Sequence, residues 1–398
     1  MENKICRIGI FGTFRGLAYL KIFAAMDDVK ITAICDKRPE AIANALPHCP
    51  DDVKTFAGFD EFIDSGLFDA VLLTNYFHEH APFAVKAMQR GIHVLSETTP
   101  ASTLAECVAL VRAVEETGCK YMLAENYPFM CANLELKRVY ETGTLGKALF
   151  AEGEYVHPMD PREATDKYAP FAEHWRRHTP CTYYSTHALA PLMHITGAIP
   201  TKVNARAAFD SAYALERQRY VADRCGIILC ETEQDSIFRI SGSCSFGPHG
   251  NWYRIGCDRG GIETVRGNQS DVRLCYNSWQ LPEGAEPSKI YTAQWTSNAE
   301  LASKAGHGGG DFWVCYNFVR YVLDDVEPFF TVYRAAAMSA VAIQAWKSVL
   351  DDGATYRIPD FRKEADRKEC ENDHLTPFPD AEGGATLPRS SKPFDPEY

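Results

Sequence analysis

A phenol and an imidazole stand three residues apart in this chain, at Tyr184 and His187. If residues 183–194 form a helix, these two side chains and that of Tyr183 fall within one turn and share a face. Tyrosine and histidine can both donate and accept protons in catalysis. A histidine in an apolar helix is, however, usually a satisfied core residue, and a buried tyrosine hydroxyl usually has only a structural partner. The spacing alone leaves both interpretations open.

A second set of residues, near the start of the chain, predicts a dinucleotide site. An apolar run over residues 5–11 breaks at Gly12, Gly16 follows, and a second apolar run ends at Asp36. A dinucleotide pocket needs a strand, a tight glycine turn, a helix whose first amides face a pyrophosphate, and a carboxylate that holds a ribose diol. Phe14 replaces the middle glycine, and the loop is about one residue shorter than the G-x-G-x-x-G fingerprint. An ordinary buried strand and turn is therefore the competing interpretation.

The carboxylate at Asp36 favours NAD over NADP, because it would repel a 2′-phosphate. Lys37 and Arg38 stand beside it and soften that repulsion. We expect NAD as the cofactor, with contacts from the glycine turn and from the end of the second strand. These expected contacts are Gly12, Thr13, Phe14, Arg15, Gly16, Asp36 and Arg38.

Further cofactor contacts are expected in the loops that follow the later strands. In an open α/β sheet, ligands bind at the carboxyl ends of the strands, so these loops should converge on the nicotinamide. For His80, shaping the loop and capping the next helix is the alternative role. The expected contacts are Asn75, His80, Glu97, Thr98 and Asn126.

The elements that must position these loops follow an α/β pattern. Short apolar runs alternate with amphipathic helices from Ile5 to Leu123, as in a parallel sheet. Thr103 and Glu106 form a capping box at the start of one connecting helix, and Gly118 ends it. Residues 1–125 are therefore predicted to be a Rossmann domain with a doubly wound parallel sheet.

The second half of the chain has a different pattern. Residues 148–157 alternate, and β-like runs follow between residues 202 and 276 without intervening helices, which predicts a large, mainly antiparallel sheet. We expect residues 126–352 to form an α+β domain for substrate binding and oligomerisation, with a late helix packing back on the first domain. Residues 353–398 are expected to be a polar tail, and the Pro- and aromatic-rich segment 157–180 to line a site.

Composition excludes several classes of protein. The 398 residues exceed what one core usually supports, and the net charge of −12 argues against nucleic acid as a partner. No apolar run is long enough to span a membrane, and an early first strand leaves no room for a signal peptide, so a cytoplasmic protein is expected. The fourteen cysteines form no C-x-x-C and are expected to be free thiols. A metal near Glu152, Glu154 and His157 remains open.

Four motifs in order, "GIFGTFRG", "DAVLLTNYFHEHAP", "GIHVLSETTPA" and "AENYP", resemble the glucose-fructose oxidoreductase, inositol dehydrogenase and MocA family of NAD(P)-dependent proteins. The resemblance covers residues 5 to about 350. Dehydrogenases of that family carry Glu-Lys-Pro where this chain has Glu97, Thr98, Thr99 and Pro100, so the usual catalytic lysine is missing. A threonine hydroxyl carries no charge to stabilise an alkoxide, which weakens net alcohol oxidation as a hypothesis.

Two later segments, "CTYYSTHALAPLMH" and "GHGGGDFW", resemble the NAD-dependent glycosidase branch of the family, typified by α-N-acetylgalactosaminidase. This resemblance implies that Tyr184 and His187 are the proton-transfer pair and that His307 binds substrate or assists. The matching residues are Tyr184, Thr186, His187, Leu189 and Pro191, then His307, Gly308, Gly309 and Asp311. Contacts to the sugar are expected from Glu125, His157, Trp175, Arg176, Tyr183 and Asp311.

The resemblance implies a glycoside hydrolase that uses bound NAD for transient oxidation at sugar C3. C2 is then deprotonated, the aglycone is eliminated, water adds, and the sugar is reduced again. The alternatives are a sugar or cyclitol dehydrogenase, including one that oxidises glycosides at C3, and a non-catalytic NAD-sensing protein. The expected partners are a carbohydrate or glycoside and further copies of the chain, paired through the antiparallel sheet.

Overall fold

The computed structural model describes residues 4–158, 169, 171–172, 174–380, 382 and 384–396, which form two compact units. The first unit comprises Met1–Asn126, Asn298–Ala336 and Phe361–Asn372. The second unit comprises Tyr127–Ser297, Ala337–Asp360 and Asp373–Tyr398. Each unit is thus assembled from separate segments of the chain, and the predicted tail contributes to both.

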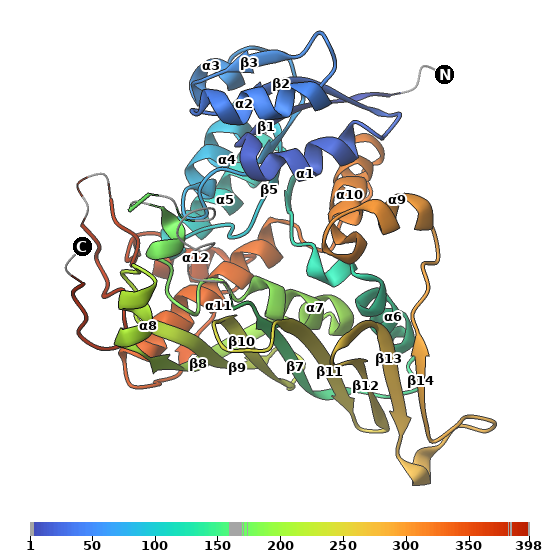
Figure 1. The fold of residues 1–398 in the computed structure, drawn as a ribbon. Helices are drawn as coiled ribbons and strands as arrows, with labels where there is room; N and C mark the ends of the chain where they lie inside the picture. Colours follow the sequence, from blue (N-terminus) through green and yellow to red (C-terminus); the bar gives the residue numbers. More distant parts are fainter. Residues whose placement is uncertain are drawn as a thin grey trace. The chain divides into compact units, whose positions relative to one another are not determined.

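The first unit contains a parallel sheet of six strands (Figure 1). The strand order is β3-β2-β1-β4-β5-β6, which confirms the predicted doubly wound sheet. Because the order reverses at β1, the crevice for a ligand lies at the carboxyl ends of β1 and β4. The strands are β1 Cys6–Phe11, β2 Val29–Cys35, β3 Lys54–Phe56, β4 Ala70–Leu73, β5 His93–Ser96 and β6 Tyr121–Leu123.

The helices of the first unit cover this sheet, with α1 beside α2 and α10, and α4 beside α5. The capping box at α5 is present as predicted, since the Thr103 side chain accepts from the Glu106 amide and Gly118 is left-handed at the C-cap. The bounds are α1 Thr13–Phe23, α2 Pro39–Ala45, α3 Phe59–Ile63, α4 His80–Met88, α5 Leu104–Thr117, α9 Ala299–Lys304, α10 Gly310–Asp324 and α12 Glu364–Cys370.

The second unit is built on a nine-stranded sheet in the order β14-β13-β12-β11-β7-β10-β9-β8-β15. Its neighbouring strands are antiparallel except for β7 and β10, which pair in parallel. The predicted large and mainly antiparallel sheet is therefore confirmed. The strands are β7 Ala148–Val156, β8 Pro200–Phe209, β9 Asp223–Thr232, β10 Ile237–Cys244, β11 Gly250–Cys257, β12 Gly260–Val265, β13 Asn268–Tyr276, β14 Ser288–Thr292 and β15 Tyr356–Arg357.

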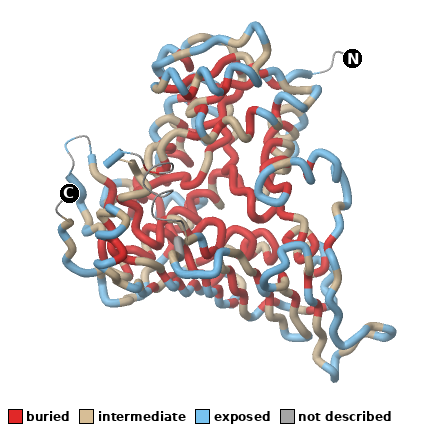
Figure 2. Tube along the Cα trace, in the orientation of Figure 1, coloured by how far each residue is buried: buried red, intermediate tan, exposed pale blue. Residues whose placement is uncertain are grey.

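Helices lie along one face of this sheet (Figure 1). The central one, α7 (Thr186–Thr196), is buried over its whole length (Figure 2). A Cβ at Gly153 of β7 would overlap the carbonyl oxygen of Ala188, so the strand needs glycine for α7 to sit directly on it. The other helices are α6 Cys131–Glu141, α8 Ser211–Glu216 and α11 Val332–Leu350, of which the part from Ala337 belongs to this unit.

The end of the chain is anchored by specific contacts. In the second unit, the Trp346 indole donates to the carbonyl of Pro388 at 2.9 Å, and Phe378 is buried. In the first unit, Arg367 of α12 is buried and paired with Glu115 of α5 at 2.5 Å. The cysteines whose side chains the structure describes are free thiols. Over the same described residues, every helix is too short or too polar to cross a membrane.

Candidate functional site

The turn between β1 and α1 depends on two glycines. Gly12 has φ 90°, and a Cβ there would lie 2.5 Å from the carbonyl oxygen of Thr74. A Cβ at Gly16 would lie 2.8 Å from Cγ2 of Ile10 and 3.0 Å from Oγ1 of Thr74. The Thr74 hydroxyl itself donates to the Gly12 carbonyl at 2.5 Å. The backbone therefore packs as closely as a dinucleotide turn requires.

Asp36 is placed against that turn from the end of β2. Its Oδ2 accepts the Thr13 amide at 2.8 Å, and its Oδ1 accepts the Arg38 amide at 3.0 Å. The Arg38 Nε lies 3.5 Å from Oδ1, and its guanidinium stands 5.5 Å from the centroid of the exposed Phe14 ring. The structure thus brings the first group of predicted cofactor contacts together at one end of the sheet.

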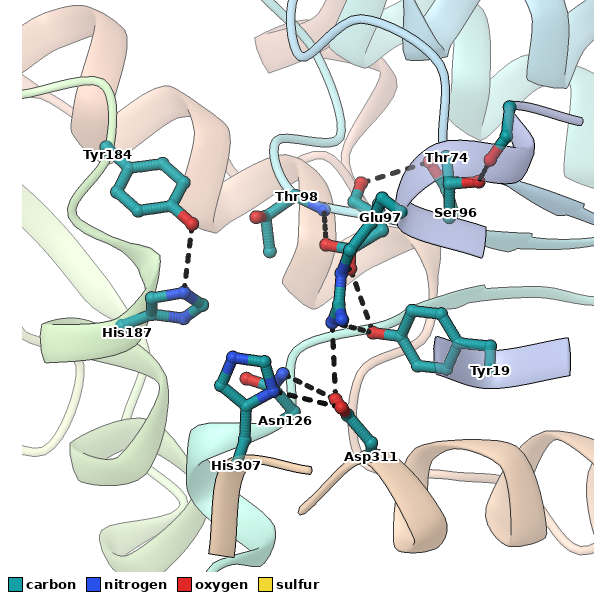
Figure 3. Close-up of polar contacts among 12 residues, drawn as sticks. Tyr19, Thr74, Ser96, Glu97, Thr98, Asn126, Tyr184, His187, His307 and Asp311 are labelled. Atoms are coloured by element: carbon teal, nitrogen blue, oxygen red, sulfur yellow. Dashed lines mark hydrogen bonds and ion pairs between the residues drawn. The ribbon is translucent and has the colours of Figure 1, made fainter. Parts of the chain in front are cut away.

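A polar cluster surrounds Arg15 in the same unit (Figure 3). Its Nε donates to Oε1 of Glu97 at 2.7 Å, and its Nη2 donates to Oδ1 of Asp311 at 3.2 Å. Tyr19 donates its hydroxyl to the same Glu97 oxygen at 2.9 Å. We call this group, with Asn126 and His307, the Arg15 cluster.

Asp311 collects three of these contacts. The amide of Asn126 donates to its Oδ1 at 2.8 Å, and Nδ1 of His307 lies 2.9 Å from its Oδ2. This bond fixes the proton of a neutral His307 on Nδ1 and leaves Nε2 as the acceptor. Arg15, Asn126 and His307, which lie far apart in the sequence, therefore meet at the Asp311 carboxylate, and Glu97 joins the cluster through Arg15.

Opposing effects set the charge of the two carboxyls in the Arg15 cluster. Burial alone would raise the pKa of Asp311, but the His307 hydrogen bond and the Arg15 charge outweigh burial and hold that pKa well below its usual range. Burial likewise works against ionisation of Glu97, and the adjacent guanidinium still lowers the pKa of Glu97. Both carboxylates are therefore ionised at neutral pH, one buried and the other nearly so.

The remaining predicted cofactor contacts lie in the loops after β4, β5 and β6. Asn75 follows β4, and its backbone nitrogen would lie 2.8 Å from a Cβ added at Gly12. The Thr98 amide donates to Oε2 of Glu97 at 3.1 Å. His80 lies in the first turn of α4, where burial lowers its pKa, so its neutral ring donates from Nδ1 to the carbonyl of Thr99 at 2.8 Å. This contact ties two loops together and favours the loop-shaping role for His80. Glu125 follows β6 and is fully buried.

In the second unit, the hydroxyl of Tyr184 lies 3.1 Å from Nε2 of His187 (Figure 3). The premise that residues 183–194 are helical is wrong at its start, because α7 begins at Thr186 and Tyr184 precedes it. The two side chains meet across the helix N-terminus instead of along one helical face.

Two tyrosine rings pack against the imidazole of His187, and a third tyrosine binds the His187 backbone. The ring of Tyr127 stacks on it at 4.2 Å between centroids, and that of Tyr155 meets it edge-on at 4.9 Å. The Tyr253 hydroxyl donates to the His187 carbonyl at 2.7 Å. The predicted pair is therefore fixed by packing on both sides.

A cavity that is open to solvent lies beside this pair. Its lining includes Tyr184 and three predicted sugar contacts, His157, Trp175 and Arg176. The guanidinium of Arg176 lies 4.3 Å from the Trp175 ring centroid. Burial and the neighbouring His249 lower the pKa of His157 to about 4, so this ring is neutral at pH 7. The aromatic and polar mixture suits a small ligand with hydroxyl groups.

Tyr183 does not join this group. Its side chain is fully buried, and its ring packs edge-on against Phe378 at 5.2 Å. The physical reason is the late start of α7, since residues 183 and 184 are not helical and their side chains diverge. Glu152 pairs with Arg239 of the neighbouring strand β10 at 2.7 Å, and Glu154 pairs with Arg266, in the turn after β12, at 2.5 Å. Across the described part of the chain, no cluster of three metal-binding side chains is found.

Several residues of both groups escaped prediction. Tyr19 had a usable signal, since it lies four residues after Arg15 on α1 and so shares its face. Tyr155 lies two residues after Gly153 on the alternating strand β7, which places both on the face under α7. Tyr253 gave no local signal, because its role depends on how β11 pairs with β7.

Two protein family models match separate parts of the chain. Residues 6–125 match the model described as an oxidoreductase family with an NAD-binding Rossmann fold. Residues 279–367 match the model described as the C-terminal domain of glycosyl hydrolase 109.

Individual relatives extend the similarity over most of the chain. A glycosyl hydrolase family 109 protein of Saccharopolyspora erythraea is 26% identical, over 91% of this chain and 84% of its own. An α-N-acetylgalactosaminidase of Shewanella oneidensis is 22% identical, over 92% and 86%.

Solved structures share the fold. Levoglucosan dehydrogenase, in complex with NADH and levoglucosan, has a TM-score of 0.75 at 17% identity and covers 90% of this chain and all of its own. Scyllo-inositol dehydrogenase from Lactobacillus casei has a TM-score of 0.69 at 16% identity, over 89% and 99%. Residues 6–125 therefore form an NAD-binding domain of this oxidoreductase family, and the chain is an NAD-binding enzyme related to the glycosyl hydrolase 109 proteins.

Proposed function

We propose that this protein is an NAD-dependent glycoside hydrolase that cleaves its substrate through transient oxidation of the sugar. The observation that carries the proposal is the hydroxyl–imidazole pair of Tyr184 and His187, 3.1 Å apart beside an open cavity with aromatic and polar walls. The position at which related dehydrogenases carry a catalytic lysine is Thr98, which cannot supply an ammonium.

The first unit supplies residues that fit NAD. Gly12 and Gly16 leave room for a pyrophosphate at the start of α1, which has no side-chain cap from Gly12. Asp36 is positioned to hold the ribose diol. Bound NAD would supply reversible oxidation at C3 of the sugar, which makes the neighbouring C2 proton acidic.

The proton steps fall to the Tyr184 and His187 pair. With Nε2 unprotonated, the Tyr184 hydroxyl donates to it, so a proton taken from the sugar by the Tyr184 oxygen passes on to the imidazole. The same pair returns a proton when the sugar is restored. His307 is the proposed assisting group, since its bond to Asp311 orients the imidazole.

The cavity walls are proposed to bind the sugar ring. Trp175 and Tyr155 offer flat apolar surfaces, and neutral His157 offers a hydrogen bond to a hydroxyl. The proposed mechanism needs no pair of carboxylates flanking the glycosidic bond, whereas most glycosidases use such a pair.

A count of products per cofactor separates this function from that of a sugar dehydrogenase. Purified protein with its bound cofactor is given 4-nitrophenyl glycosides without added NAD⁺. A hydrolase releases many nitrophenols per molecule of NAD and accumulates no NADH. A dehydrogenase forms NADH one for one and stops when the NAD⁺ is used, which would refute the proposal.

We also propose that the large sheet pairs with a second copy of the chain. Ile227 and Leu229 of β9 and Ile237 of β10 are exposed, whereas the alternate residues Ile228 and Phe238 are buried. Apolar side chains exposed together on a sheet mark interaction surfaces. Light scattering should give a mass above 44.5 kDa for the wild type, and Leu229→Lys should lower it.

A further inference from the structure

The cavity of the second unit has a strongly cationic lining. Four arginines take part in it, at positions 176, 177, 217 and 219. Among the described residues that line the cavity, none is an aspartate or a glutamate. This local excess of positive charge stands in a chain whose net charge is −12. It is therefore a feature of this site and not of the protein as a whole.

Within the described part of the chain, the side chains of Arg177 and Arg219 hydrogen-bond to neutral oxygens. Arg177 donates from Nε and Nη2 to the carbonyl of Ala169, at 3.0 and 2.8 Å, and from Nη1 to Oε1 of Gln218 at 3.3 Å. Arg219 donates from Nη2 to the carbonyl of Thr179 at 3.3 Å. Its Nε is buried and makes no hydrogen bond within the described part of the chain. Neutral oxygens orient these guanidiniums but do not cancel their charge.

Two described carboxylates on adjoining segments, Asp210 and Asp223, have other hydrogen-bond or ion-pair partners. Asp210 pairs with Arg224 at 3.2 Å. Asp223 acts electrostatically on Arg219, but its oxygens accept the amide and the hydroxyl of Ser391. Burial also raises the pKa of Asp223, so its negative charge is held less firmly than that of an exposed carboxylate.

A neutral sugar would bring no negative charge to pair with the arginines of this lining. Guanidinium groups bind carboxylate, sulfate and phosphate oxygens with charge-assisted and often bidentate hydrogen bonds. Positive groups gathered in a cleft also raise the local concentration of anions. A half-buried cation whose partners are neutral carbonyls gains from a ligand that brings the opposite charge.

We propose that the glycoside recognised by this cavity carries an oxyanion group, a carboxylate, sulfate ester or phosphate ester, which Arg177 and Arg219 bind. Arg176 and Arg217 line the same cavity. The inference rests on the proposed function in so far as Tyr184, on the same lining, belongs to the catalytic pair.

Binding of single sugars to the holoenzyme tests this without any need for turnover. Calorimetry compares glucose with glucuronic acid, glucose 6-sulfate and glucose 6-phosphate, at low and at physiological ionic strength. At least one acidic sugar should bind about tenfold or more tightly than glucose, as expected for a charge-assisted pair, and lose that advantage as salt rises. The preferred acid identifies the oxyanion. Equal affinities for all four sugars would overturn the inference.

Variants locate the effect. Arg177→Gln and Arg219→Gln should each reduce the preference for the acidic sugar about tenfold and leave glucose binding nearly unchanged. Arg206→Gln is the matched control, because Arg206 is an exposed arginine of the same unit, paired with Asp352 outside the cavity. If the glutamine variants unfold, Arg219→Lys, which keeps charge but loses the bidentate fork, should weaken the preference in a folded protein. A preference that survives in folded Arg177→Gln and Arg219→Gln proteins would also overturn the inference.

The two proposals fail in different ways. Tight binding of an acidic sugar by a protein that releases no aglycone from the matching acidic glycoside would leave the anion site standing and remove the hydrolase. Efficient cleavage of neutral 4-nitrophenyl glycosides, with no gain for the uronide, sulfate or phosphate forms, would do the reverse.

Discussion

The Tyr184 hydroxyl and Nε2 of His187 lie 3.1 Å apart, although the tyrosine precedes α7 and the histidine lies in its first turn. The stacked ring of Tyr127 and the hydroxyl of Tyr253 fix the histidine. The distance is thus set before substrate arrives. A proton can pass between the two groups without a change of rotamer.

Removal of either member of this pair should stop the reaction. Tyr184→Phe and His187→Gln each keep the approximate shape of the side chain and should lower kcat about a hundredfold or more, the usual scale for a general acid or base. Steady-state rates with 4-nitrophenyl glycosides measure the loss. Tyr356→Phe, at a half-buried tyrosine of β15 bonded to Asp351, is the conservative control and should retain wild-type rates. Near-wild-type kcat in folded Tyr184→Phe and His187→Gln proteins would remove the pair from the mechanism.

The close packing of α7 on β7 can be tested directly at Gly153. Gly153→Ala places a methyl group against the Ala188 carbonyl, so α7 must move away from β7 and take His187 with it. We expect a loss of about 1–3 kcal/mol in stability, typical of overpacking, together with reduced kcat. Gly250→Ala is the control, since a Cβ there meets nothing within 4 Å. Thermal unfolding and kinetics that do not distinguish the two variants would show that α7 tolerates the shift.

The Arg15 cluster should matter to stability far more than an exposed ion pair. Arg15→Met leaves the nearly buried Glu97 and the fully buried Asp311 without their cation, which costs about 3–5 kcal/mol. Arg7→Met removes only an exposed pair with Asp69 and should cost less than about 1 kcal/mol. Urea unfolding of the two variants checks the difference. Adding Glu97→Gln to Arg15→Met should recover part of the loss, and equal costs for Arg15→Met and Arg7→Met would contradict the assignment.

The same cluster predicts acid sensitivity. The pKa values of Asp311 and Glu97 are lower in the folded protein than in the unfolded chain. Their contribution is therefore complete above the unfolded values of about 4 and is lost as pH falls through the lowered folded values. As the pH falls below about 4, the wild type should lose stability more steeply than Asp311→Asn. Parallel curves from urea unfolding at several pH values would count against this role for Asp311.

Cofactor choice should depend on Asp36. Asp36→Ser removes the charge that would repel a 2′-phosphate and the proposed partner of the ribose diol. We expect NAD to bind about tenfold more weakly and NADP more tightly, measured by fluorescence titration. Asp64→Ser alters an exposed carboxylate of the same unit, paired with Arg90, and should change neither affinity. Unaltered affinities in Asp36→Ser would place the ribose contact elsewhere.

The sequence predicted what local rules determine. The capping box of Thr103 and Glu106 and the stop at Gly118 fixed α5, because their signals lie within a few residues. The alternation over residues 148–157 likewise predicted β7. The start of α7 was missed, because apolar residues continue through the preceding turn and no side chain caps the helix at Ser185.

Long-range pairings were beyond prediction. The parallel pairing of β7 with β10 depends on how the whole sheet assembles, not on either strand. The contact of Arg15 with Asp311 joins residues 296 positions apart, and each alone has an ordinary local role as a helix residue. The positively charged lining of the cavity could not be predicted for the same reason. Arg177 and Arg219 lie in separate segments of the chain, and only the fold brings them to one cavity.

The position of solvent hydrogen in the product tests the proposed chemistry most directly. Holoenzyme is allowed to cleave a 4-nitrophenyl glycoside in D₂O, and the released sugar is examined by NMR. Removal and return of the C2 proton by Tyr184 and His187 predicts deuterium at C2 of every sugar released, without net formation of NADH. A product that keeps its original hydrogen at C2 through complete turnover would contradict the elimination route and the roles assigned to both residues.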